Sequence, residues 1–292
     1  CQQYPRYTEE FGSLREVGIS LSCPEAARIM LNNSKKVEFE LSENNEVVSS
    51  YNDINAQLFI ELLQSRKIVM DIIQDRTIDL RKRAVVALLF VDEIQEKIDE
   101  SEIKEIKSVR EKYLDKGFLE ELINELEEYR DNEGSKYDDM HEYFKVFKDL
   151  KHITPDDPLG LNDALRYFWQ TDEDEELYII KHRQFEEYYK DKLYKFENIL
   201  VYFVFRYFMK AVFDYDILAK IKTALVSYMI IRELAVVRYI ENNEFTDEDM
   251  VDIAHTYSKD IEHLEENIEA LAELFETNDV FDIEEMVIAL MN

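Results

Sequence analysis

The sequence is poor in the residues that make turns, with 5 glycines and 4 prolines among 292 residues. Strand-rich folds need many turns, which rely on glycine and proline, so this scarcity argues against a mostly β protein. Long helices joined by short connections need few of either. Because 46% of the residues are hydrophobic, the chain can bury a substantial core. We therefore expect a mostly α fold with a helical, bundle-like body.

Positive charge is also scarce, and the formal net charge is −30. Phosphate binding needs clustered Lys and Arg, and anionic membranes attract basic segments, so we expect neither nucleic acid nor a membrane as a partner. The simpler explanation of the charge is that Asp and Glu cover solvated helix faces and keep the chain soluble. Attraction to a basic, Lys-rich protein surface is the alternative.

Long uncharged hydrophobic runs are absent as well. The most apolar stretch, ENILVYFVFRYFMKAVF, contains Arg206 and Lys210. A charge at the centre of a membrane helix is costly, so this stretch predicts a buried core helix. No secretory signal peptide is visible, and we expect a cytoplasmic protein.

The N-terminal part predicts a small β element and one short helix. Residues 15–22 (REVGISLS) suggest a strand, and residues 35–43 (KKVEFELSE) show the period-two alternation of a half-buried strand. Between them, Pro24 favours the first position of a helix, which makes Cys23 its N-cap. We divide the chain into residues 1–45, the end of a cysteine-rich region with short strands and a helix, and an all-helical domain over residues 46–292.

Common enzyme signatures are missing: the sequence has no GxG, no GxxxxGK loop, no GxSxG elbow and no HExxH. His255 and His263 are eight residues apart and could share a helix face near Asp260 and Glu262. A metal site there is conceivable, but exposed polar residues on an acidic helix are the more economical interpretation.

His182 is followed by Glu186 and Glu187 at helical spacing. Di-iron helix bundles repeat an ExxH pattern on several helices, which this sequence does not do. We interpret these residues as ordinary surface ion pairs.

Cys1 and Cys23 are the only cysteines. At a helix start, unpaired N–H groups and the helix dipole favour a thiolate at Cys23, which is the form that binds metal. A disulfide, two unrelated thiols and a pair of metal ligands all remain open. Zinc and iron–sulfur centres usually take four protein ligands, so a metal site would need further ligands upstream of residue 1. The chain begins without methionine, and we expect it to be the C-terminal portion of a longer protein.

Three stretches resemble the flagellin lysine-N-methylase family of bacteria, whose members carry a C-x-x-Y-P-R element, an L-S-C-P-E-A-A element about twenty residues later, and an E-N-x-L-V element that opens an aromatic-rich helix. The matching residues are Cys1, Tyr4, Pro5 and Arg6, then Leu21, Ser22, Cys23, Pro24, Glu25, Ala26 and Ala27, and finally Glu197, Asn198, Leu200 and Val201.

The resemblance implies methyl transfer from S-adenosylmethionine to lysine side chains of flagellin, with an iron–sulfur cluster held by the cysteine-rich part. It makes Cys1 and Cys23 candidate metal ligands, and Tyr4 and Arg6 candidate residues at the edge of the site. Because the family's upstream cysteines are missing here, we expect no cluster in this chain alone. The sequence identifies no catalytic base.

Two other kinds of protein remain possible: an acidic helical binding module, or a lipoprotein without catalytic activity that begins on its lipid-modified cysteine. The encoding gene would separate them. A cysteine-rich segment upstream supports the methylase, and a lipobox supports the lipoprotein.

Overall fold

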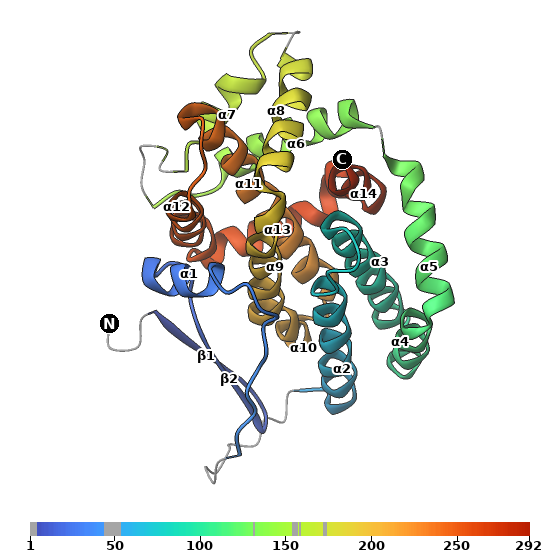
Figure 1. Cartoon of the computed structure of the whole chain (residues 1–292). Helices are drawn as coiled ribbons and strands as arrows, with labels where there is room; N and C mark the ends of the chain where they lie inside the picture. Colours follow the sequence, from blue (N-terminus) through green and yellow to red (C-terminus); the bar gives the residue numbers. More distant parts are fainter. Residues whose placement is uncertain (1–4, 44–53, 131, 154–156, 158, 172–173) are drawn as a thin grey trace.

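Helices make up most of the chain, in a computed structural model that describes residues 5–43, 54–130, 132–153, 157, 159–171 and 174–292 (Figure 1). A two-stranded sheet precedes them near the N-terminus. Besides short 3-10 turns and one π-helix, the elements are β1 (Arg6–Phe11), β2 (Leu14–Ile19), α1 (Pro24–Leu31), α2 (Ala56–Ile73), α3 (Leu80–Asp99), α4 (Ile106–Leu114), α5 (Lys116–Glu125), α6 (Glu133–Asp149), α7 (Leu161–Phe168), α8 (Asp174–Tyr189), α9 (Tyr194–Tyr207), α10 (Ala211–Asp214), α11 (Ile217–Asn242), α12 (Asp247–Tyr257), α13 (Glu265–Thr277) and α14 (Ile283–Met291). The expected mostly α fold with a small N-terminal β element is confirmed.

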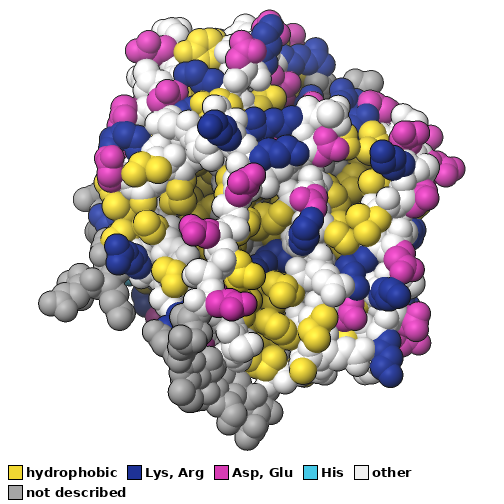
Figure 2. Space-filling view, turned by 60° about the horizontal axis from the view of Figure 1, so that its bottom comes forward, with side chains coloured by type: hydrophobic (Ala, Val, Ile, Leu, Met, Phe, Trp, Pro, Cys, Tyr) yellow, Lys and Arg dark blue, Asp and Glu magenta, His cyan; other side chains and the backbone are white. Residues whose placement is uncertain are grey.

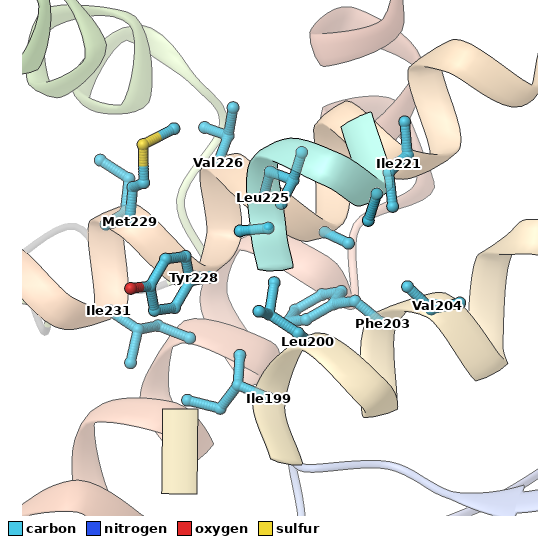
Figure 3. Close-up of a cluster of buried hydrophobic side chains, with 14 of the residues drawn as sticks. Ile199, Leu200, Phe203, Val204, Ile221, Leu225, Val226, Tyr228, Met229 and Ile231 are labelled. Atoms are coloured by element: carbon cyan, nitrogen blue, oxygen red, sulfur yellow. The ribbon is translucent and has the colours of Figure 1, made fainter. Parts of the chain in front are cut away.

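Helix α11 is the centre of the core, and every residue from Ile221 to Val237 is buried. A helix that is buried all round is typical of a position enclosed by other helices, and α3, α9, α12 and α13 pack against α11. Figure 3 shows one of these contacts, with Leu200 and Phe203 of α9 on one side and Leu225 and Tyr228 of α11 on the other.

The most apolar stretch of the sequence forms α9 and the turns after it. Residues 196–204 of this helix are buried without interruption, so the prediction of a core helix is confirmed. None of the described helices is long and apolar enough to cross a membrane.

The β element is an antiparallel hairpin in which Phe11 lies opposite Leu14. The turn between them uses Gly12 with a φ of +64°, a conformation that costs glycine little. Strand β2 confirms the strand predicted within residues 15–22, whereas β1 was not predicted.

Gly18 lies opposite Tyr7, and a Cβ atom at Gly18 would come within 2.2 Å of the Tyr7 ring. Glycine therefore allows the Tyr7 side chain to lie across β2.

The strand predicted at residues 35–43 is wrong, because this segment forms no strand and pairs with no other strand among the described residues. A side-chain amide takes the place of a neighbouring strand: the Val37 N–H donates to Gln74 Oε1 at 2.6 Å, and Gln74 Nε2 donates to the Val37 carbonyl at 3.3 Å. The Phe39 ring stacks on Phe205 of α9 with 4.5 Å between ring centroids. The alternating pattern thus reflects contacts with helices.

The predicted helix start at Pro24 is confirmed by α1, with Cys23 as its N-cap in an extended conformation. Residues 44–53 lie outside the described residues, so the boundary between 1–45 and 46–292 stays a prediction.

On the face shown in Figure 2, acidic and basic side chains are interspersed among hydrophobic ones. The negative charge on this face is therefore not gathered into a single patch.

Candidate functional site

Two of the elements that carry the resemblance lie side by side, although 168 residues separate Met30 from Asn198. Asn198 of α9 is buried, and its Nδ2 donates to the carbonyl oxygens of Met30 and Asn33 at 2.9 Å each. These carbonyls lie at the end of α1, where a helix leaves carbonyl groups without internal partners. Asn198 therefore fixes α1, and with it Cys23, to the helical body.

The neighbouring carboxylate of Glu197 is also buried, and it is shared by two guanidinium groups. Arg83 Nη1 lies 2.7 Å from Glu197 Oε2, and Arg76 Nη2 lies 2.8 Å from Oε1. Because both oxygens are occupied by arginine, this carboxylate is not available to a substrate. Its position indicates that Glu197 holds α9 against the start of α3.

Cys23 is partly exposed, and its thiol is not in a disulfide. Its side chain makes no cap hydrogen bond, while its carbonyl accepts the Ala27 N–H at 2.9 Å. Arg6 is exposed on β1. Cys1 and Tyr4 lie outside the described residues, so the expected closeness of the two sulfur atoms stays a prediction.

A cluster needs several thiolates, and Cys23 is the one cysteine among the described residues. The described part of the chain also contains no group of three or more His, Cys, Asp or Glu side chains that could hold a metal ion. The residues that the structure describes therefore do not form a cluster site by themselves. Among them, Cys23 offers one partly exposed thiol, and its role as a metal ligand stays a prediction.

Behind Cys23 lies a buried polar cluster around the carboxylate of Glu262. Arg206 Nε lies 2.7 Å from Glu262 Oε1, and the hydroxyls of Tyr202 and Tyr207 donate to the same oxygen at 2.8 and 3.1 Å. Ser258 donates to the other oxygen. Burial raises the pKa of both tyrosines well above 10, so they remain neutral donors. We call these five residues the Glu262 cluster.

The Glu262 cluster reaches the segment that carries Cys23. Ser20 Oγ lies 3.3 Å from Ser258 Oγ, and the Leu21 N–H donates to the Tyr202 hydroxyl at 3.4 Å. From the hairpin, the Tyr7 ring covers Arg206, with 4.4 Å between the guanidinium carbon and the ring centroid. The cluster thus joins β1, the L-S-C segment and α9.

The interpretation of Asp260 and Glu262 as exposed residues is wrong, since their exposed fractions are 2% and 3%. Ser258–Glu262 forms a π-helix, whose wider turn shifts residues relative to ordinary helical spacing. Asp260 accepts the Ile153 N–H at 2.9 Å and contacts His152. His263 is exposed.

A second polar region lies on another side of the body, in a cleft of about 190 Å³. Helices α3, α6, α8 and α14 supply its walls, and most of its charged side chains are basic. The residues that line it are Arg81, Arg130, Lys136, Tyr178, Ile179, His182, Arg183, Glu186, Met291 and Asn292. We call it the basic cleft.

His182 is buried in this cleft, so the interpretation as a surface ion pair with Glu186 and Glu187 is wrong. Its Nε2 lies 2.6 Å from Glu233 Oε2, and its Nδ1 lies 2.8 Å from the Tyr178 carbonyl oxygen. Burial raises the pKa of Glu233, but the neighbouring His182, Lys136 and Arg232 outweigh this effect and hold that pKa at about 2. Both ring nitrogens thus face acceptors, so a proton must lie between Nε2 and the carboxylate, even though burial lowers the pKa of His182.

Lys136 lines the basic cleft and is only 3% exposed. Its Nζ has no hydrogen-bond partner in the described part of the chain, and Glu233 Oε1 is 3.6 Å away. Burial and the nearby Arg232 lower the pKa of Lys136 to about 8. The ammonium group is therefore incompletely neutralised.

Residues 66–289 match the family described as FliB lysine N-methylase C-terminal domain. The chain belongs to the FliB lysine N-methylase family. No curated protein sequence and no solved structure matches it.

Within this FliB family member, the matched range contains the E-N-x-L-V element, all of the Glu262 cluster and all the lining of the basic cleft except Met291 and Asn292. It does not reach the hairpin or Cys23. The family assignment therefore rests on the helical body, independently of the two cysteines.

The sequence interpretation missed Lys136, Arg232 and Glu233. The last two sit in the run MIIRELAVV of α11, where apolar residues flank them on both sides. Charged residues inside such a run are buried with the rest of the helix and need partners. Charged residues within an apolar run could therefore have identified Arg232 and Glu233 as buried. Lys136 lies in a polar stretch, and nothing in the sequence around it predicts that it is buried.

Proposed function

We propose that this chain is the C-terminal body of a cytoplasmic, S-adenosylmethionine-dependent enzyme that methylates lysine side chains of flagellin. The match of residues 66–289 to the FliB lysine N-methylase C-terminal domain carries this proposal. In the reaction, the bond from the methyl carbon to the sulfonium sulfur breaks and a bond to the lysine nitrogen forms. The products are S-adenosylhomocysteine and methyl-lysine.

The acceptor lysine must lose a proton before it attacks, because only the neutral amine has a free electron pair. The basic cleft does not suit this amine, since the surrounding guanidinium groups and Lys136 would repel a lysine ammonium. The net charge of −30 favours approach of Lys-rich surfaces at low ionic strength. Recruitment of flagellin that depends on this charge should therefore weaken as salt increases.

We further propose that Cys1 and Cys23 are ligands of an iron–sulfur cluster completed by cysteines outside this chain, with Tyr4 and Arg6 at the edge of the site. The partly exposed thiol of Cys23 at the start of α1 supports this. Since the described residues offer one thiol, no step of the methyl transfer is assigned to the cluster.

The test uses the full-length protein that the gene encodes, purified without oxygen and incubated with flagellin and S-adenosylmethionine. We expect methylated flagellin in the complete reaction and none when S-adenosylmethionine is omitted. Cys23→Ala should lose iron while its far-UV circular dichroism stays unchanged. A protein that binds flagellin but transfers no methyl group would instead be an acidic binding module.

A further inference from the structure

The basic cleft is unusual in a protein whose acidic residues outnumber its basic ones by 30. Four of its lining side chains are Arg or Lys, and Glu186 is the single carboxylate among them. A concave site lined by one sign of charge concentrates its field and raises the local concentration of counter-ions. The sign here selects an anion.

The carboxylates near the cleft are already engaged. Glu186 is shared by Arg81, at 3.2 Å, and by Arg232. Glu233 accepts the proton-bearing Nε2 of His182 at 2.6 Å. These two carboxylates thus serve Arg81, Arg232 and His182. Asp79 also pairs with Arg81 at 3.4 Å and Glu127 with Arg130 at 2.8 Å, whereas Lys136 has no hydrogen-bonded carboxylate among the described residues.

The positive charge of Lys136 is less well compensated than that of these arginines. Its Nζ is buried and lies 3.6 Å from Glu233 Oε1, beyond hydrogen-bond distance. Its other near neighbour is the Tyr178 ring, with 5.8 Å between Nζ and the ring centroid. A buried ammonium normally finds hydrogen-bond acceptors, and no described residue supplies one. The unused donors point to an acceptor that comes from outside the chain.

The size of the cleft limits what this acceptor can be. Its volume of about 190 Å³ is below the roughly 300 Å³ at which pockets for drug-sized ligands begin. It has room for a small anion with a few waters, or for the charged end of a larger molecule.

We propose that the basic cleft is a binding site for an oxyanion, a carboxylate or a phosphate group, with Lys136 as its most buried ligand and Arg81, Arg130 and Arg183 around it. Oxygen atoms of the ligand supply the acceptors that Lys136 Nζ lacks, and the guanidinium groups suit carboxylate and phosphate geometry. This site does not depend on the methyl-transfer reaction.

The experiment is isothermal titration calorimetry on the full chain with sodium phosphate, and in a separate arm with sodium acetate, at constant ionic strength. We expect saturable binding of at least one probe. Tighter binding of phosphate indicates a phosphate-bearing ligand, and comparable binding of acetate indicates a carboxylate.

Lys136→Met removes the charge, keeps an unbranched side chain that is one heavy atom shorter, and should weaken binding at least tenfold. Lys222→Met is the matched control, because Lys222 is also buried but its Nζ donates to the carbonyl oxygens of Phe281 and Phe275 at 2.8 and 3.2 Å. The Lys222→Met variant should bind phosphate and acetate with the same affinity as the unchanged protein. Circular dichroism checks that each variant is folded.

Should Lys136→Met not fold, Arg183→Gln at the exposed mouth of the cleft takes its place, with an expected several-fold loss of affinity. The proposal is overturned if neither probe binds saturably. It is also overturned if the folded variants bind as tightly as the unchanged protein.

Discussion

Replacing Glu262 with alanine should lower the free energy of unfolding by about 3–5 kcal/mol, the usual cost of removing one partner of a buried ion pair. Arg206, whose side chain is 17% exposed, would keep its charge because guanidinium does not deprotonate in proteins. The hydroxyls of Tyr202, Tyr207 and Ser258 would also lose their shared acceptor.

Each of those hydroxyls donates to a charged group, and such hydrogen bonds are worth about 1.5–3 kcal/mol. The contributions of neighbours in one network do not add, so the ion-pair figure is the better guide to the total. A double variant, Arg206→Met with Glu262→Leu, should recover most of the loss, since a packed apolar pair often replaces a buried ion pair at little cost.

The assay is urea unfolding followed by far-UV circular dichroism. Glu266→Ala is the control, because Glu266 pairs with Lys151 at 2.7 Å on the surface, where the two side chains are 68% and 59% exposed. Exposed pairs contribute little, so this control should barely change the unfolding midpoint. If Glu262→Ala behaves like Glu266→Ala, the Glu262 cluster does not hold the body together as argued.

The same variant provides a second readout at Cys23. Since Ser20 and Leu21 contact Ser258 and Tyr202, losing Glu262 should loosen the segment that precedes the thiol. We expect faster modification of Cys23 by a thiol reagent, measured in a Cys1→Ser background. An unchanged rate would show that the cluster does not position this segment.

Three further predictions concern other buried polar groups. Asn198→Ala should cost about 1–3 kcal/mol and speed amide hydrogen exchange in α1, whereas unchanged exchange would contradict its clamping role. Burial, reinforced by the Glu285 charge, raises the pKa of Asp139 to about 7, so the folded state binds more protons than the unfolded one and stability falls as the pH rises toward 7. Asp139→Asn should therefore stabilise the protein at about pH 8 and not at about pH 4, as thermal unfolding would show. Oxyanion affinity should fall as Lys136, with a pKa of about 8 beside Glu233 and Arg232, loses its proton above that pH; constant affinity up to about pH 10 would contradict its role as a ligand.

Much of the fold could be predicted because it depends on composition and helical spacing. The scarcity of glycine and proline indicated helices, and Pro24 marked the start of α1. The apolar stretch around Phe203 was correctly predicted to be a core helix and not a membrane helix, because Arg206 and Lys210 would be too costly inside a membrane.

The errors arose where tertiary contacts override local pattern. Residues 35–43 alternate like a strand, but Val37 pairs with the side chain of Gln74 and not with a neighbouring strand. The π-helix at Ser258–Glu262 moves Glu262 into the core, which ordinary helical spacing does not anticipate. Strand β1 depends on its partner β2 and carries only a weak signal of its own.

For the candidate site, the sequence identified Cys23 but not the buried charges around it. The pairing of His182 with Glu233 joins residues 51 positions apart, and local spacing pointed to Glu186 instead. The cations of the basic cleft come from three helices and from Arg130, which follows a 3-10 turn, so no single stretch of sequence reveals the cleft.

The most direct test of the proposed reaction locates the transferred methyl group. The full-length protein that the gene encodes is incubated with flagellin and S-adenosylmethionine that carries a deuterated methyl group, and the flagellin peptides are sequenced by tandem mass spectrometry. We expect the deuterated methyl group on the Nζ atoms of lysine residues, together with an equal amount of S-adenosylhomocysteine. Flagellin that stays unlabelled with a folded, iron-loaded protein, or label on residues other than lysine, would contradict the assignment of a flagellin lysine methyltransferase.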